Sequence, residues 1–318
     1  MCCARGLSCG MKKFDYSSSP ERLFKDRGPF FHVCSKPVDK LLFNNDQDRT
    51  AALVNIAMAA EESSVVLLAY AIMSNHFHVI LAGNAPEQFY ACFKERANRY
   101  LSRHGEGGRS LPEEPTIVPI TTIYQMMNEV VYVVRNQYVV DASVNPLSHI
   151  WCSGFLYFNP MMKQLALNVK YVPAATLSGR GMAKLTFSKE TEPPFGDLTL
   201  LNGFPAPSSF VDYKLVECLF SDARQFTTKL FKNVEGQIET ARLLGEVPVI
   251  PDEELSGLMW KYCKDEWGVD KIRQLSTAQK IALAKHMKVS YHSSNSQISR
   301  ITLLERNNVD ALFPLSAK

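Results

Sequence analysis

The sequence lacks any uninterrupted apolar segment of the ~20 residues that are needed to span a lipid bilayer. Its longest apolar stretch, residues 65–82, is broken near its middle by turn-type residues and two histidines. This stretch therefore predicts two strands joined by a turn. The N-terminus also lacks the continuous apolar core of a secretion signal. We therefore expect no membrane partner.

Paired cysteine motifs are missing too. The sequence contains eight cysteines but no CxxC pair, so a zinc ribbon is unsupported. Apart from Cys2, Cys3 and Cys9, the cysteines are scattered singly. This usage is typical of a reducing compartment and predicts a cytoplasmic location.

A large excess of positive charge is also missing, since the formal net charge of the 318 residues is only +3. Proteins dedicated to nucleic-acid binding often carry more, because phosphate contacts dominate their affinity. The net charge therefore counts mildly against such a function and directs attention to local patches. With 46% hydrophobic and 21% charged side chains, the composition is that of an ordinary globular protein with one large domain or two modest ones.

Strand and helix patterns are mixed in the first half of the sequence. Apolar and β-branched runs predict strands at residues 30–38, 64–73 and 76–82, and apolar periodicity predicts helices at residues 50–60, 87–103 and 121–140. The last of these helices has Thr121 or Thr122 as its N-cap. Residues 145–212 are irregular and rich in Pro, Gly and Ser, whereas residues 213–244, 252–267 and 276–304 predict helices.

The strand predicted at residues 76–82 begins with His76, Phe77 and His78. Strand side chains alternate between the two faces of a sheet, so His76 and His78 share one face while Phe77 faces the core. Two imidazoles side by side are a natural pair of metal ligands. The alternative interpretation is a pair of hydrogen-bonded histidines on a half-exposed strand.

The helix predicted at residues 121–140 places Tyr132 and Asn136 on one face, because residues four apart share a helix face. Two imidazoles and the Asn136 amide oxygen would leave positions open for water and a phosphate oxygen, as Mg²⁺ or Mn²⁺ prefers. A phenol beside such a cation is a candidate covalent nucleophile on phosphorus. The alternative is a tyrosine packed in the core. Glu129 also faces this side, where a solvated helix carboxylate is the favoured interpretation.

The order and spacing of these blocks resemble the single-tyrosine HUH transposases, in particular the REP-associated tyrosine transposases. The resemblance runs from about Phe31 to Phe158 and is carried by FHVCSKP, LLAYAIMSNHFHVIL, YVVRN and WCSG. It implies a ferredoxin-like α+β domain whose antiparallel sheet carries the histidines, with a mostly α-helical region after it.

By position, His76 and His78 match the metal-ligating histidines of this family, Tyr132 the attacking tyrosine and Asn136 the polar ligand. The resemblance implies transesterification on single-stranded, hairpin-forming DNA with Mg²⁺ or Mn²⁺ as cofactor. The tyrosine attacks a phosphodiester, keeps the 5′ phosphate and frees a 3′ hydroxyl, and reversal rejoins strands without ATP. A second hypothesis is a domesticated protein that binds hairpin repeats without cutting them. Whether the protein acts as a monomer or a homodimer stays open.

One position departs from the family pattern, which usually has proline after the asparagine. Gln137 stands there, so the helix is expected to run on beyond Asn136. Gln137 is an alternative ligand, but it lies five residues from Tyr132 and points away, which favours Asn136. Tyr124 and Tyr138 are rival nucleophiles, although neither has a fitting polar ligand four residues later.

Positive residues gather on and beyond the helix predicted at residues 87–103, namely Lys94, Arg96, Arg99, Arg103 and Arg109. The three arginines inside the helix form one stripe, which suits a phosphate backbone. A solvated helix face is the alternative. Tyr100, beside the stripe, is expected to pack rather than to stack on a base.

The C-terminal residues predict a helix from Ser276, a break rich in Ser and Asn, and a second helix with exposed Gln297, Ser299 and Arg300. This pattern is similar to a helix-turn-helix that binds duplex DNA or a hairpin stem; an ordinary helical hairpin is the alternative. The whole chain is thus predicted to comprise an N-terminal tail, a nuclease domain, an irregular connector and a helical C-terminal region, at residues 1–28, 29–158, 159–212 and 213–318.

Overall fold

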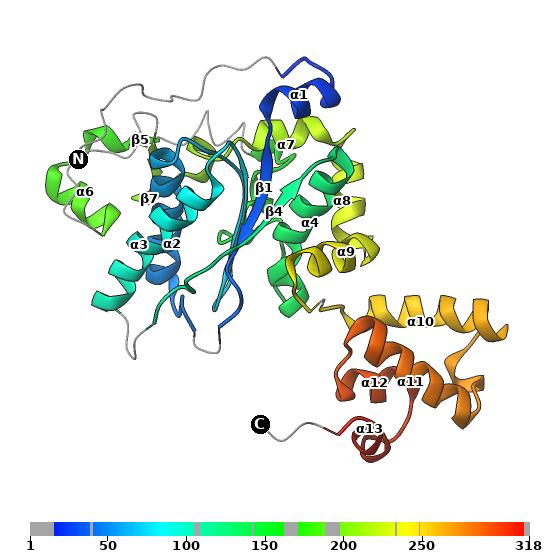
Figure 1. The fold of residues 1–318 in the computed structure, drawn as a ribbon. Coiled ribbons are helices and arrows are strands. Elements are labelled where there is room, and N and C mark those ends of the chain that lie inside the picture. The colour runs from blue at the N-terminus through cyan, green and yellow to red at the C-terminus, as the bar shows by residue number, and fades with distance from the viewer. Residues whose placement is uncertain are drawn as a thin grey trace. The chain divides into compact units, whose positions relative to one another are not determined.

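The computed structural model describes residues 16–38, 41–104, 109–141, 143–161, 171–187, 198–232, 234–247 and 249–314. The chain divides into two compact units, an N-terminal unit of residues 1–231 and a C-terminal unit of residues 232–318 (Figure 1). In the described part of the chain, every helix is too short or too polar to cross a membrane.

A four-stranded antiparallel sheet lies at the centre of the N-terminal unit. Its strands are β1 (Phe30–Cys34), β2 (Val66–Ile72), β3 (Phe77–Ala82) and β4 (Thr116–Ile120), in the order β2-β3-β1-β4. Strands β1 to β3 confirm the three predicted strands. Strand β4 has no counterpart among them, and Pro119 within it weakens its strand pattern. Proline is tolerated there because β4 is an edge strand, where one side of the backbone needs no partner.

Two helices cover one face of this sheet. Helix α2 (Asp46–Glu62) connects β1 to β2, and α3 (Pro86–His104) connects β3 to β4. Helix α2 is buried along its whole length from Ala51 to Ala60, because it lies between the sheet and other helices. The helix is longer than the one predicted at residues 50–60, because the small apolar residues that supported the prediction occupy only this buried part.

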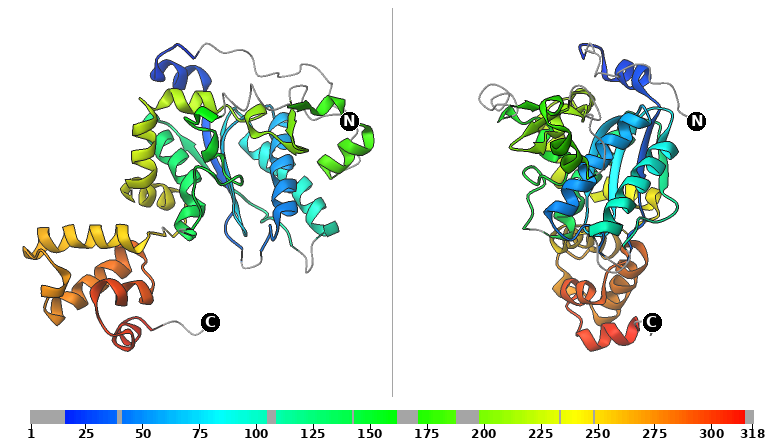
Figure 2. Two further views of the ribbon diagram at one scale, coloured as in Figure 1. Left: turned by 180° about the vertical axis from the view of Figure 1, so that it is seen from behind. Right: turned by 90° about the vertical axis from the view of Figure 1, so that its left-hand side faces the viewer.

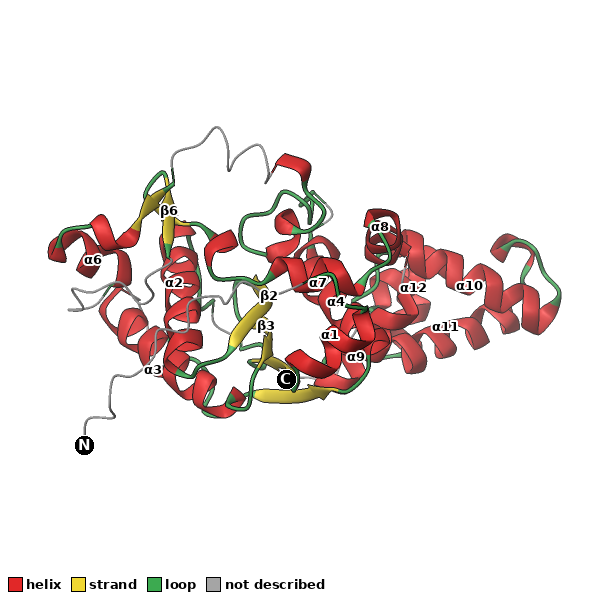
Figure 3. Cartoon of the chain, turned by 90° about the horizontal axis from the view of Figure 1, so that it is seen from above, coloured by secondary structure: helices red, strands yellow, loops and turns green. Residues whose placement is uncertain are grey.

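Helix α4 (Ile123–Val140) covers the opposite face, where it packs on β2 and β3. Seen from above, the strands lie between α2 and α3 on one side and α4 on the other (Figure 3). Thr122 caps the helix by accepting a hydrogen bond from the Gln125 amide, as one of the two predicted N-caps. The helix continues beyond Asn136 as expected, since no proline stops it.

The residues that follow α4 pack on the same core. The short helix η1 (Ser153–Leu156) sits against α4, and Gly154 is required there: a Cβ atom would lie 2.3 Å from the Pro146 carbonyl oxygen and 2.5 Å from Val134 Cγ1. Inside the segment predicted as an irregular connector, Met182 and Leu200 are buried in this core. The WCSG block and the described part of the predicted connector thus belong to the N-terminal unit.

Smaller elements complete the N-terminal unit. They are the helices α1 (Pro20–Arg27), η2 (Ala174–Thr176), α6 (Gly179–Thr186), η3 (Pro207–Ser209), α7 (Tyr213–Leu219) and α8 (Ala223–Lys232), and a second sheet of β5 (Val172–Pro173), β6 (Thr199–Leu201) and β7 (Phe204–Pro205). The described part of this unit is therefore α+β, as predicted. Residues 213–231, grouped with the C-terminal helices on sequence, cluster with the N-terminal unit.

The C-terminal unit is helical and has its own core, which includes Leu255, Met259, Leu283 and Ile298. Its helices are α9 (Val234–Leu244), α10 (Asp252–Trp267), η4 (Ile272–Gln274), α11 (Thr277–Tyr291), α12 (Asn295–Thr302) and α13 (Arg306–Leu312), and α10 to α13 run from orange to red in Figure 2. Helix α11 ends at Tyr291 and is followed by His292, whose backbone is left-handed, and Ser294 caps α12. The predicted helix, break and helix are all present.

Candidate active site

The alternation of side chains along β3 separates a packing face from a polar face. The Phe77 ring packs against the Phe93 ring of α3, with centroids 4.8 Å apart. His78 therefore points the other way, towards α4, and is fully buried. The ring of His76, which precedes β3, lies 4.9 Å from that of His78 between centroids. The two histidines lie side by side, as the strand pattern predicts.

Helix α4 turns one face towards these histidines. Glu129, Tyr132 and Asn136 are spaced by three and four residues and so share that face. The Asn136 side-chain nitrogen lies 2.9 Å from His78 Nε2. The Tyr132 ring centroid lies 5.6 Å from that of His78. The predicted nucleophile, amide and histidines therefore meet between α4 and the sheet.

Two site residues were missed or misjudged on sequence. His32 on β1 lies between Glu129 and His78: its Nδ1 is 2.6 Å from the Glu129 carboxylate, and its Nε2 is 3.1 Å from His78 Nδ1. Glu129 is fully buried, so its interpretation as a solvated carboxylate is wrong. A lone histidine in a strand gave no signal, because only the pairing of β1 with β3 brings it to His78.

Burial keeps the two motif histidines uncharged. It lowers the pKa of His76 to about 4. It also lowers the pKa of His78 well below the usual value, and the nearby imidazoles of His76 and His32 act in the same direction. A neutral imidazole carries the lone pair that a metal ion requires. Both rings are thus in the form that ligates a metal at neutral pH.

A second group of possible ligands shares this region. Ligand atoms of His32, Cys34 and His78 lie within 4.8 Å of one another, and all three residues are buried. A thiolate suits softer ions such as Zn²⁺, whereas imidazoles with an amide oxygen leave room for Mg²⁺ or Mn²⁺. His78 belongs to both groups, so a metal ion in one would exclude the other.

The positive stripe on α3 is largely paired with acidic side chains. Arg96 pairs with Glu62, and only 11% of its side chain is exposed. Arg99 pairs with Glu95 of its own helix, and Lys94 lies 2.7 Å from the Glu113 carboxylate. Arg103 at the end of the helix is exposed. Arg99 and Arg103 are therefore the members that remain accessible to a phosphate backbone.

Arg109 does not extend this stripe. It is buried and donates a hydrogen bond of 2.8 Å to Asp48 on α2. The Tyr100 hydroxyl donates to the same carboxylate, so Tyr100 packs as expected. The expectation of a surface role for Arg109 is wrong because a buried carboxylate requires a charged partner.

The polar residues predicted on the second C-terminal helix bond within their own unit. Gln297 donates to the Ile250 carbonyl and to Asp252 at the start of α10. Arg300 forms an ion pair with the same carboxylate, at 2.5 Å. The Ser299 hydroxyl donates to the Leu304 carbonyl. Each of these side chains thus has a partner within the C-terminal unit, while the Arg300 side chain remains 58% exposed.

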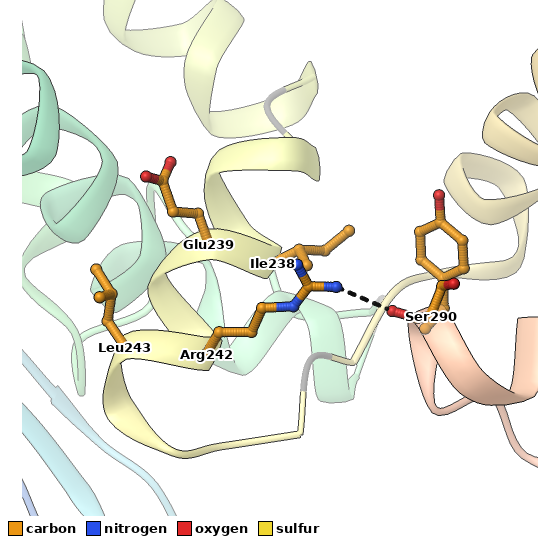
Figure 4. Close-up of a pocket in the computed structure, with 6 residues that line it drawn as sticks. Ile238, Glu239, Arg242, Leu243 and Ser290 are labelled. Atoms are coloured by element: carbon orange, nitrogen blue, oxygen red, sulfur yellow. Dashed lines mark hydrogen bonds between the residues drawn. The ribbon is translucent and has the colours of Figure 1, made fainter.

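The C-terminal unit also contains a cavity of about 440 Å³ between α9 and α11. It is lined by Ile238, Glu239, Arg242, Leu243, Ser290 and Tyr291 (Figure 4). Arg242 reaches across it and donates to the Ser290 carbonyl, at 3.3 Å. Because its lining offers neither histidine nor cysteine, this cavity does not compete with the site beneath α4.

Comparisons with known proteins give little beyond this geometry. No protein-family model matches the chain, and no curated protein sequence matches it. Among solved structures, the chain is similar to a REP-associated tyrosine transposase bound to a REP hairpin, with a TM-score of 0.32 and 12% identity over 49% of this chain and 84% of that chain. Values this low establish neither the family nor the activity of this protein.

Proposed function

We propose that the N-terminal unit is a metal-dependent nuclease of the single-tyrosine HUH transposase type, which cuts and rejoins single-stranded hairpin DNA. The observation that carries this proposal is the meeting of Tyr132 and Asn136 with the histidines of β3, with the Asn136 amide 2.9 Å from His78 Nε2. The strand order β2-β3-β1-β4, with α2 and α3 as its crossovers, supports the ferredoxin-like arrangement that this family has.

The residues present fit a divalent metal ion. His76 and His78 lie side by side with uncharged rings, and Asn136 offers an amide oxygen once its side chain turns. His76, His78 and Asn136 would hold the ion, and Gln137, half-buried one residue further on, is the alternative ligand. When bound, Mg²⁺ or Mn²⁺ supplies positive charge that stabilises the charge developing on the phosphate.

The chemistry then requires one nucleophile and one leaving group. The phenol oxygen of Tyr132 attacks phosphorus and loses its proton to solvent, while the bond to the 3′ oxygen breaks and that oxygen takes up a proton. The products are a 5′ phosphotyrosine and a free 3′ hydroxyl. A 3′ hydroxyl that attacks the phosphotyrosine restores a phosphodiester, so the number of ester bonds is conserved and no ATP is needed.

One observation favours the second candidate, a protein that binds hairpin DNA without cutting it. Tyr132 is only 6% exposed, whereas a nucleophile must reach a phosphate. The nuclease therefore needs a small opening between α4 and the sheet when DNA binds. A binding protein needs none, so a test of function must separate binding from cleavage.

Replacing His76 or His78 with alanine is expected to remove metal binding and cleavage together. Each change deletes a proposed ligand, so Mn²⁺ affinity should fall on the order of 100-fold or more, beyond the cost of losing an outer-shell partner. Mn²⁺ titration by calorimetry and cleavage of a labelled hairpin measure the two effects. His104→Ala, which alters an exposed histidine on α3, is the matched control. Cleavage that survives in the two site variants or in EDTA would contradict the metal requirement.

Reversing the charge of Arg99 and Arg103 is expected to weaken binding of single-stranded DNA roughly tenfold at low salt. The loss of phosphate contacts should also reduce the slope of log affinity against log salt by about 1 to 2. Fluorescence anisotropy across a salt series measures both quantities. The double variant Arg22→Glu with Lys25→Glu on α1, where both residues are exposed, controls for net charge. An equal loss in this control would show that α3 makes no specific contact.

A further inference from the structure

A continuous row of hydrogen bonds runs through the site. It starts at Glu129 on α4, passes through His32 on β1 and His78 on β3, and returns to α4 at Asn136. The three joining distances are 2.6, 3.1 and 2.9 Å. Glu129, His32 and His78 are fully buried, so water does not compete for the hydrogen bonds between them.

The direction of the hydrogen bonds follows from the carboxylate end. Both oxygens of Glu129 have donors, His32 Nδ1 at 2.6 Å and the Gln125 amide at 3.5 Å. A neutral imidazole carries one proton, so a ring that donates from Nδ1 accepts at Nε2. His32 Nε2 therefore accepts the proton of His78 Nδ1.

The other end of the row agrees with this direction. Because His78 carries its proton on Nδ1, its Nε2 is unprotonated and accepts the hydrogen bond from the Asn136 amide. His76 shows the same pattern, since its Nδ1 faces the Asn75 side-chain oxygen at 2.8 Å. Both motif histidines thus present Nε2 as the lone-pair atom.

We propose that Glu129 and His32 are positioning residues, which hold His78 in the tautomer whose Nε2 lone pair is available for a metal ion. The proposal rests on the function proposed above and adds two residues that the motif does not contain. Mutation of a group that hydrogen-bonds to the non-ligating ring nitrogen of a metal-bound histidine commonly lowers metal affinity 10- to 100-fold. Here the fixing group is a second histidine, itself held by a buried carboxylate.

The tautomer can be measured without metal or DNA. Long-range proton–nitrogen spectra of the full chain, with ¹⁵N in its seven histidines, report which ring nitrogen carries the proton. We expect His32 and His78 both to be protonated at Nδ1. Spectra of the His32→Phe and His78→Gln variants assign the signals. Protonation of His78 at Nε2 would overturn the proposal, because the row would then run in the opposite direction.

Variants of the two positioning residues test the consequence for metal binding. His32→Phe and Glu129→Leu remove the acceptors and should weaken Mn²⁺ binding about 10- to 100-fold. Glu129→Gln keeps a carbonyl oxygen to accept from His32 and should restore most of the affinity. His104→Phe is the matched control, because it makes the same kind of change at an exposed histidine on α3 that lies outside the row. Thermal unfolding curves identify any variant that fails to fold.

The outcomes separate the two proposals. Full Mn²⁺ affinity in both His32→Phe and Glu129→Leu would overturn the positioning role even if the wild type cuts DNA. Equal losses in Glu129→Gln and Glu129→Leu would overturn it too, since the acceptor would then be irrelevant. A wild type that binds no Mn²⁺ overturns the nuclease proposal and the role in metal binding, while the tautomer measurement still decides how His78 is held.

Discussion

Changing Tyr132 to phenylalanine is expected to abolish the covalent link between protein and DNA. The substitution removes only the phenol oxygen and keeps the ring, which lies against the rings of His78 and His32. Fold, Mn²⁺ affinity and DNA affinity should therefore stay close to wild type. Adduct formation should fall on the order of 10³-fold or more, because no other atom replaces the nucleophile. Denaturing gels with a labelled hairpin measure the adduct.

Two other tyrosines on α4 serve as controls. Tyr124 is exposed and lies beneath the Lys229 ammonium group, 4.7 Å from its ring centroid. Tyr138 packs against Phe231, with ring centroids 6.0 Å apart. Tyr124→Phe and Tyr138→Phe should form the adduct at the wild-type rate. An adduct that survives in Tyr132→Phe but is lost in one of these variants would show that the other tyrosine is the nucleophile.

The second large effect concerns stability. Changing Arg109 to methionine is expected to destabilise the N-terminal unit by about 3–5 kcal/mol, because it leaves the Asp48 carboxylate buried without its charged partner. Hydrogen exchange of the amides in β1 to β3 measures the loss in this unit alone. Arg49→Met removes an ion pair to Asp46, which is 80% exposed, and should change stability by less than about 1 kcal/mol.

This effect should depend on pH in a defined direction. Burial raises the pKa of Asp48, but hydrogen bonds from Arg109, the Asn44 amide and Tyr100 outweigh it, so the net pKa is lowered. A carboxylate with a lowered pKa contributes stability above its unfolded value, about 3.9, and loses it as the pH falls through the folded value. The unfolded pKa is the same for both proteins and cancels, so the gap between wild type and Arg109→Met should be full at pH 7 and shrink as the pH falls through the folded pKa values of Asp48 in the two proteins. A gap that stays constant would exclude the ion pair as its cause.

Local periodicity was enough to predict which side chains of the candidate site lie close together. The alternation of His76, Phe77 and His78 and the spacing of Tyr132 and Asn136 each depend only on neighbouring residues. The structure places these side chains together as predicted. The extension of α4 beyond Asn136 followed from the absence of proline in the same way.

Features that depend on distant partners could not be read from one sequence. His32 joins the site through the register of β1 with β3, and Glu129 is buried because His32 lies opposite it. Arg109 turns inwards because Asp48, 61 residues away, lies beneath it. The segment with Met182 and Leu200 lacks regular periodicity, yet its apolar residues fill the N-terminal core. In each case tertiary packing decided what local pattern left open.

The most direct test of the account identifies the residue that carries DNA. The full chain is incubated with hairpin single-stranded DNA and Mn²⁺, the adduct is digested, and the modified peptide is sequenced by mass spectrometry. The account predicts a 5′ phosphate of DNA on Tyr132 and none on Tyr124 or Tyr138. DNA that is bound tightly but never linked, or linked to another residue, would contradict the proposed nuclease.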